Sequence, residues 1–107
     1  MARYAVNLHA KNLLLTDHEE RIQFGGAWVW RIVRAQSLAE AHRVSTEEFL
    51  AALRRTDEIR NPASEPLSIV VEQTRVLGPF ARGKNTAIVF YIDSDDPRNQ
   101  TAPSNSP

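Results

Sequence analysis

Two tryptophans and two arginines lie close together in one apolar segment. Trp28 and Trp30 alternate with Val29, so they point to the same side of a predicted strand, and Arg31 and Arg34 flank them. Aromatic rings beside guanidinium groups on a sheet can stack nucleic-acid bases, and the same combination suits a protein interface. Tryptophan in a small core is the more common explanation, so we weigh a core or protein-interface role above nucleic-acid binding.

The three histidines are the next candidates for chemistry. His9 follows an alternating segment and points to the face opposite Tyr4 and Leu8, which makes it the histidine that we favour for a binding role. His18 lies between two acidic residues, but chain neighbours rarely converge on one metal ion, so we expect a solvated loop there. His42 flanks the apolar stripe of a predicted helix and is expected to pack against the edge of the sheet.

No motif of a catalytic or cofactor site is found in the sequence. The chain has no cysteine, which excludes disulfides, thiolate ligands and cysteine nucleophiles. Asp93, Asp95 and Asp96 are spaced like the start of a calcium loop, but the required glycine and the distal glutamate are missing. The serines and glycines form neither a Gly-x-Ser-x-Gly elbow nor a phosphate loop. We therefore predict no catalytic residues, no metal site and no cofactor.

Charge and composition restrict the class of partner. Lys plus Arg equals Asp plus Glu at 13 each, so the formal net charge is zero. A dedicated binder of nucleic acid or of anionic membranes usually carries a basic excess, so both partners are less expected. The lack of cysteine fits a reducing compartment, and neither a signal peptide nor a membrane-spanning stretch is recognisable. We expect a cytoplasmic bacterial protein.

Four segments have the pattern of β-strands. They cover residues 4–9, 27–35, 67–77 and 86–93, with Leu13–Leu15 and Arg21–Phe24 as extensions of the first two. The segment 27–35 is the strongest, because bulky and β-branched side chains dominate it. Gly25–Gly26 directly before it predicts a bulge or a tight bend, since glycine tolerates backbone angles that other residues avoid.

One amphipathic helix is expected between the second and third strands. Ser37 and Glu40 form a capping box in front of an apolar stripe with helical spacing. Ser45 and Glu48 repeat the same signature further along. Residues 38–55 therefore form either one helix or two shorter ones, and the unbroken stripe favours one.

This order of elements indicates an α+β fold. We expect a four-stranded, mostly antiparallel sheet (β-β-α-β-β) with one main helix packed on one face, formed by residues 1–93. Residues 94–107 hold three prolines among polar side chains and no apolar cluster, so they are expected to be a disordered polar tail. The pattern leaves open which face of the sheet the helix covers.

The predicted strands carry apolar side chains on both faces. On the strongest strand, Val29 and Val33 oppose Trp28 and Trp30. A single helix covers only one face, so the other face would expose a contiguous apolar patch, which monomers seldom do. We therefore predict a homodimer through the helix-free sheet face, or another protein bound there, or coverage by the segment Leu13–Phe24.

Two short stretches carry a resemblance to a known family. The chain opens with Arg3-Tyr4-Ala5-Val6-Asn7-Leu8 and enters its helix through Ala35-Gln36-Ser37-Leu38-Ala39-Glu40-Ala41. Over residues 3–93 this is similar to a family of small bacterial domains of unknown function, which open with a Trp/Tyr strand and have an Ala-x-Ser-x-x-Glu-Ala step. The resemblance implies no activity, cofactor or catalytic residue. Such small domains sometimes resemble immunity proteins that neutralise toxins, an analogy of fold alone.

Three functional hypotheses follow from the sequence. The leading one is a non-catalytic protein-binding module, either immunity-like or an accessory subunit, because no coherent catalytic set of residues is found. The alternative is a module that binds single-stranded nucleic acid through Trp28, Trp30, Arg31 and Arg34 on the sheet. The third is a small enzyme built around His9 and a nearby carboxylate.

Overall fold

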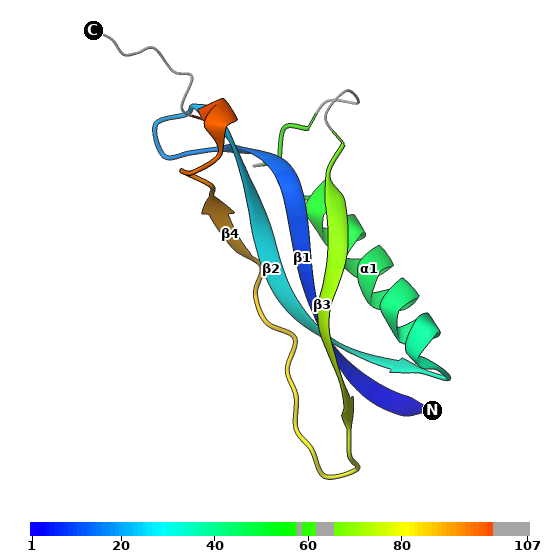
Figure 1. Cartoon of the computed structure of the whole chain (residues 1–107). Coiled ribbons are helices and arrows are strands. Elements are labelled where there is room, and N and C mark those ends of the chain that lie inside the picture. Colours follow the sequence, from blue (N-terminus) through cyan, green and yellow to red (C-terminus); the bar gives the residue numbers. More distant parts are fainter. Residues whose placement is uncertain (58, 62–65, 100–107) are drawn as a thin grey trace, which may run out of the picture.

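A long β-hairpin forms the centre of the sheet. The computed structural model describes residues 1–57, 59–61 and 66–99. In this part of the chain, β1 (Ala2–Thr16) and β2 (Ile22–Ala35) form the hairpin, β3 (Ser68–Leu77) pairs with β1, and β4 (Val89–Ile92) pairs with β2. All pairings are antiparallel, in the order β3-β1-β2-β4, with one helix packed against the sheet (Figure 1). The predicted α+β fold is confirmed.

The helix α1 (Leu38–Arg54) is a single unbroken element. The Ser37 hydroxyl accepts a hydrogen bond from the Glu40 backbone N–H at 3.1 Å, and the Glu40 carboxylate accepts one from the Gln36 N–H at 2.7 Å. The first contact satisfies an N–H group that lacks a partner at a helix start, and the second ties the residue before the N-cap to the first turn. Ser45, whose pattern also suggested a start, is buried in the helix and donates to the Ala41 carbonyl oxygen. The one-helix interpretation is therefore confirmed.

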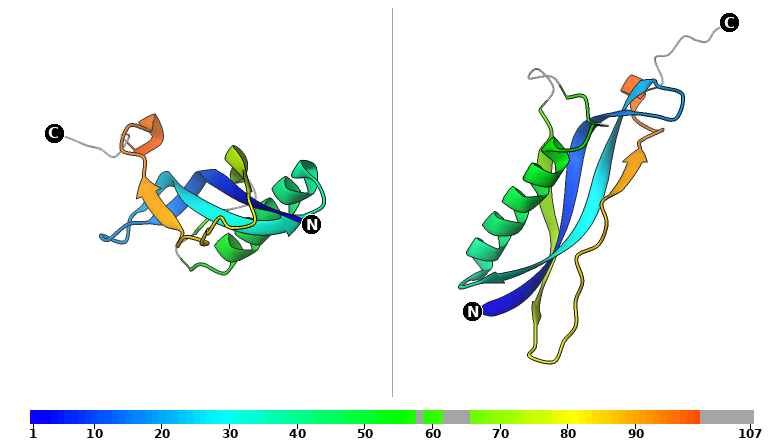
Figure 2. Two further views of the ribbon diagram at one scale, coloured as in Figure 1. Left: turned by 90° about the horizontal axis from the view of Figure 1, so that it is seen from below. Right: turned by 180° about the vertical axis from the view of Figure 1, so that it is seen from behind.

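The core lies between α1 and one face of the sheet. Its buried residues are Tyr4, Val6, Leu8, Ala10, Leu13 and Leu15 of β1, Ala27, Val29, Val33 and Ala35 of β2, and Ala41, Phe49 and Leu53 of α1. Between the bulges, the alternate residues of each strand point to the opposite face, which α1 leaves uncovered (Figure 2). His42 extends from α1 to the edge strand β3, as expected, where its Nε2 lies 2.7 Å from the Thr74 hydroxyl oxygen.

Of the two alternatives expected at Gly25–Gly26, the hairpin has an irregularity of the bulge kind at this point and no tight bend in β2. Strand β2 continues through both glycines, and the irregularity lies in the partner strand between Ala10 and Leu13. Each glycine instead allows the close approach of β4. A Cβ atom on Gly25 would meet the Tyr91 backbone at under 3.0 Å, and one on Gly26 would meet the Tyr91 hydroxyl.

Strand β4 is shorter than the sequence suggests. The segment before it follows β2, but side chains replace part of the backbone ladder. The Asn85 amide oxygen accepts from the Ile32 N–H at 2.7 Å, and the Thr86 hydroxyl accepts from the Trp30 N–H at 2.9 Å. Gly83 lies against the Ile32 side chain, so this connection covers part of the face that the helix leaves open. The segment Leu13–Phe24, which was an alternative cover, instead extends the hairpin.

The segment that follows β4, up to Asn99, docks on β2. A short 3-10 turn η1 (Pro97–Asn99) follows β4, and the Asn99 amide group bonds both backbone polar atoms of Phe24 at 2.7 and 2.8 Å. The predicted disordered polar tail covers 94–107, but Asn99 within it is held by hydrogen bonds to Phe24 and Asp93, and residues 100–107 lie outside the described residues. Within the described residues, no helix is long and apolar enough to cross a membrane.

Candidate functional site

The helix-free face gathers four of the side chains that the sequence singles out. Trp28, Trp30 and Arg34 alternate along β2 and therefore share this face. His9 of β1 lies directly opposite Trp28 in the sheet register. The alternation that the sequence predicts for Trp28 and Trp30 is present, and the register adds Arg34 and His9 to the same face.

Arg31 lies on the other face. Its register partner is the core residue Val6, and its guanidinium group forms an ion pair of 2.7 Å with Glu48 of the helix. The period of two along a strand requires this, because Arg31 follows Trp30 by one residue. Arg31 therefore cannot act beside the tryptophans and serves to join β2 to α1.

A chain of polar contacts runs through His9 across the sheet. His9 Nδ1 lies 3.3 Å from Glu72 Oε2 of β3, and His9 Nε2 lies 2.5 Å from the Tyr91 hydroxyl oxygen of β4. The Trp28 ring stacks on the imidazole with 3.8 Å between ring centroids and 10° between planes. His9 is only 9% exposed, so these contacts supply nearly all of its polar partners.

The carboxylate in this chain comes from an irregularity in β3. Asn7 faces Gln73 and Leu8 faces Val71, so Glu72 is an extra residue between the two pairs. Such a bulge redirects a side chain, and here the Glu72 side chain meets His9. Sequence reasoning anticipated a carboxylate near His9 but missed Glu72 and Tyr91, because neither a bulge nor the pairing of distant strands is visible as a local motif.

Tyr91 completes the chain in its neutral form. Burial raises the pKa of the Tyr91 phenol above its ordinary value of 10.0, and the negative charge of Asp93 raises it further. The phenol therefore stays protonated near neutral pH and donates to His9 when the imidazole is neutral. Gly26 makes this approach possible, because any side chain there would meet the Tyr91 hydroxyl.

A second aromatic group lies towards the N-terminal end of the same face. The Arg75 guanidinium carbon is 5.5 Å from the Trp30 ring centroid, a cation–π distance. The two residues border a hollow of about 210 Å³ that is lined by further cations and by apolar side chains. Its lining consists of Ala5, Trp30, Ile32, Arg75, Leu77, Arg82, Gly83, Lys84 and Thr86.

The charges of the chain cancel in sum but are separated in space. Five cations gather at this end of the helix-free face: Arg3, Arg34, Arg75, Arg82 and Lys84. Within the described ranges, none of them forms an ion pair with a carboxylate. The carboxylates lie mainly on α1, at the β1–β2 turn and around η1. The zero net charge therefore conceals a basic region.

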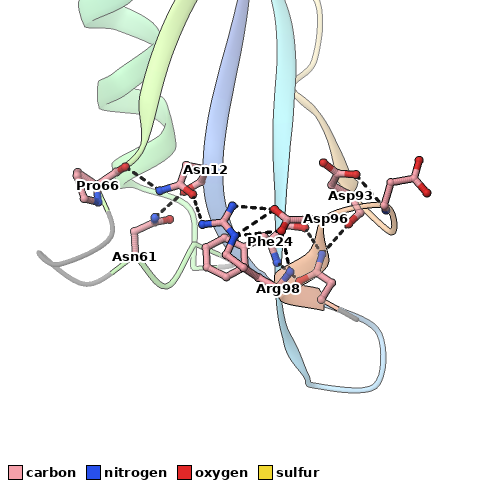
Figure 3. A network of polar contacts seen from close by, with 9 residues as sticks. Asn12, Phe24, Asn61, Pro66, Asp93, Asp96 and Arg98 are labelled. Carbon is pink, nitrogen blue, oxygen red and sulfur yellow. Dashed lines mark hydrogen bonds and ion pairs between the residues drawn. The ribbon is translucent and has the colours of Figure 1, made fainter. Parts of the chain in front are cut away.

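The opposite end of the face is nearly balanced in charge. The Arg98 guanidinium carbon lies 3.4 Å from the Phe24 ring centroid and the group bonds Asn12 and Asp96 (Figure 3). Hydrogen bonds and charge from Arg98 hold the pKa of Asp96 below its ordinary range. A hollow of about 360 Å³ lies here, bordered by His9 and Tyr91 as well. Among the residues that the structure describes, no three side chains of His, Asp or Glu are placed to hold a metal ion.

Comparisons with known proteins found no match to this chain. No protein-family model matches it. No curated protein and no solved structure matches it either. The similarity to small bacterial domains therefore stays a prediction, and arguments about function depend on the geometry of the helix-free face.

This face can do three things chemically. The aromatic rings offer flat surfaces for stacking, the unpaired cations attract phosphate or other anions, and the His9 contacts can exchange a proton. The histidine and carboxylate of the enzyme hypothesis are in contact, but burial restricts the access of a substrate to His9. The first two capacities together are typical of binding rather than of turnover.

Proposed function

We propose that this chain is a non-catalytic module that binds single-stranded nucleic acid on its helix-free sheet face. The observation that carries the proposal is the group of cations without carboxylate partners beside Trp30. On the sequence alone, the zero net charge ranks single-stranded nucleic acid below a protein partner. The spatial separation of charge removes that objection, because a strand of phosphates responds to the local field rather than to the sum.

The two kinds of side chain have complementary roles. Phosphates displace their counterions when they meet Lys or Arg, which supplies affinity without sequence preference. Bases stack on exposed aromatic rings, which contributes about 1–3 kcal/mol per base. Trp28 and Trp30 lie two residues apart on one face, with the cations beyond Trp30. We infer that bases lie over the tryptophans and the backbone follows the cationic end.

Fluorescence anisotropy with a labelled oligothymidylate and oligouridylate of about 12 nucleotides tests this proposal. Binding should weaken with salt, and each of Arg75→Gln and Arg82→Gln should make the slope of log K against log salt shallower by about 0.7. Arg54→Gln is the matched control, because Arg54 is an exposed arginine of α1. Absence of binding at low salt, or an equal loss in the Arg54 variant, would overturn the proposal.

A protein partner is the second candidate, and one observation favours it. Large apolar side chains are exposed on β4 and in the connection before it, with Val89 at 60% and Phe80 at 94%. Such residues fit a hydrophobic protein surface, as the immunity-like and accessory-subunit hypotheses require. A stoichiometric complex with a protein that survives nuclease treatment and high salt would favour this candidate over nucleic acid.

A further inference from the structure

The polar chain through His9 lies in the middle of the proposed binding face. It contains the only imidazole on that face, since His18 is in the β1–β2 turn and His42 is on α1. We propose that protonation of His9 controls this face, so that nucleic acid binds more tightly as the pH falls. The inference rests on the proposed function for its ligand, but the proton switch itself is a property of the free protein.

With a neutral imidazole, the contacts assign the position of each proton. A carboxylate only accepts hydrogen bonds, so Glu72 requires the proton of His9 on Nδ1. The bare Nε2 then accepts from the Tyr91 hydroxyl. Glu72, His9 and Tyr91 form a directed chain in this state, and only Glu72 carries a charge.

Protonation reverses one link of the chain. Both ring nitrogens now donate, so Nε2–H donates to the Tyr91 oxygen and the phenol proton must turn to another acceptor. The cation is not left without partners: Glu72 is 3.3 Å away as an ion-pair partner, and the stacked Trp28 ring offers its electron-rich face. No group has to move far for the charge to be accepted.

Apart from the polar contacts Glu72–His9–Tyr91, the charges around His9 cancel one another. Glu72 comes from β3 and Tyr91 from β4, while Lys11 follows on β1. Asp93, Asp96 and Arg98 border the hollow that His9 shares, and Arg98 pairs with Asp96. Lys11 offsets Asp93 and Arg98 offsets Asp96, so protonation of His9 takes the local sum from the single negative charge of Glu72 to zero.

The positive charge that His9 gains lies next to the ring on which a base would stack. One more cation near the phosphate backbone should steepen the salt slope by about 0.7 for a single strand. Because the pair Glu72–His9 is partly exposed, we expect affinity to rise only about two- to fivefold. Imidazole is the side chain that ordinarily changes charge between about pH 5 and 8, so the tests below span that interval.

The proton switch can be tested on the full chain without nucleic acid. A protonated imidazole in ring contact quenches tryptophan emission, so wild-type fluorescence should fall between about pH 8 and pH 5.5. Trp28→Phe and His9→Gln should each abolish this change, whereas Trp30→Phe, His18→Gln and His42→Gln should retain it. An unchanged titration in His9→Gln would overturn the proposal. Tyr91→Phe, which keeps the ring, should shift the midpoint and serves if His9→Gln unfolds.

Anisotropy with the same labelled oligothymidylate at about pH 8 and pH 5.5 tests the link to binding. Wild type and His18→Gln should bind two- to fivefold more tightly at the lower pH, as argued from the exposed ion pair. His9→Gln should bind with little dependence on pH. Binding by His9→Gln with the wild-type pH dependence would overturn the switch and leave the proposed function intact. If tryptophan fluorescence changes with pH as expected but the oligothymidylate does not bind at either pH, the proposed function and its nucleic-acid ligand are overturned.

Discussion

At the scale of single residues, Gly26 decides whether Tyr91 reaches His9. A Cβ atom on Gly26 would lie under 3.0 Å from the Tyr91 hydroxyl and from the Ala10 carbonyl oxygen. We predict that Gly26→Ala lowers the free energy of unfolding by about 1–3 kcal/mol, as overpacking usually does. Urea unfolding measures the loss. Gly78→Ala is the control and should cost little, because nothing lies within 4 Å of its Cβ position. Equal effects of both changes would contradict this prediction.

Tyr91 should also govern stability at alkaline pH. Burial, and then the charge of Asp93, raises the pKa of the folded phenol above 10.0. The unfolded chain therefore loses its phenol proton first as pH rises, so this contribution is present below pH 10.0 and is lost through the pKa of folded Tyr91. We expect Tyr91→Phe to lose less stability than wild type between about pH 9 and pH 11, measured by urea unfolding. Asp93→Asn should lower the pKa of Tyr91, whereas Asp95→Asn, the control, should not.

The candidate site was predictable from sequence only where strand alternation determines it. That alternation correctly groups Trp28, Trp30 and Arg34, and it puts Arg31 on the core side. Glu72 joins the group through a bulge, which breaks the alternation and so cannot be derived from it. Tyr91 joins through the pairing of β2 with β4, a tertiary contact for which Gly25–Gly26 was the only local signal.

At the scale of elements, the start of α1 depends on one hydroxyl group. Ser37→Ala removes the acceptor for the Glu40 N–H, and we predict a loss of about 0.5–2 kcal/mol in the free energy of unfolding. Ser45→Ala is the matched control, since its hydroxyl only donates back to the Ala41 and His42 carbonyl oxygens within the helix. Thermal or urea unfolding of the two variants compares them. A larger loss in Ser45→Ala would contradict a single helix capped at Ser37.

The end of the sheet shows why element boundaries were harder to predict than element types. Thr86 and Asn85 hold their segment on β2 with side-chain oxygens, so the strand pattern extends further than the backbone ladder. Asn99 and Arg98 dock an otherwise polar segment through an amide pairing with Phe24 and a cation–π contact. Composition alone predicts that these polar residues are solvated, because it carries no information about the strand on which they dock.

At the scale of the whole molecule, the helix-free face has two proposed uses that exclude each other. The face presents apolar side chains, with Trp28 at 36%, Val70 at 37% and Val89 at 60% exposure, among polar ones. The molecule measures 60 × 25 × 21 Å, so a sheet face along its long axis has room for a contact on the order of the standard 800 Å² per partner. A second copy and a nucleic-acid strand would both cover Trp28, so they must compete.

We therefore predict a homodimer that single-stranded nucleic acid dissociates. Two-fold pairing of identical faces is the most common form of self-association, and burial of the exposed apolar groups favours it. Sedimentation equilibrium should show a species of twice 12.1 kDa that returns to 12.1 kDa protein per complex when oligothymidylate is added. Val89→Glu should weaken the dimer because Val89 pairs with Trp28 on this face. Leu38→Glu, which changes an exposed apolar residue of α1, should not. A single 12.1 kDa species at high protein concentration would exclude the dimer, and the exposed apolar groups would then remain available to a different protein.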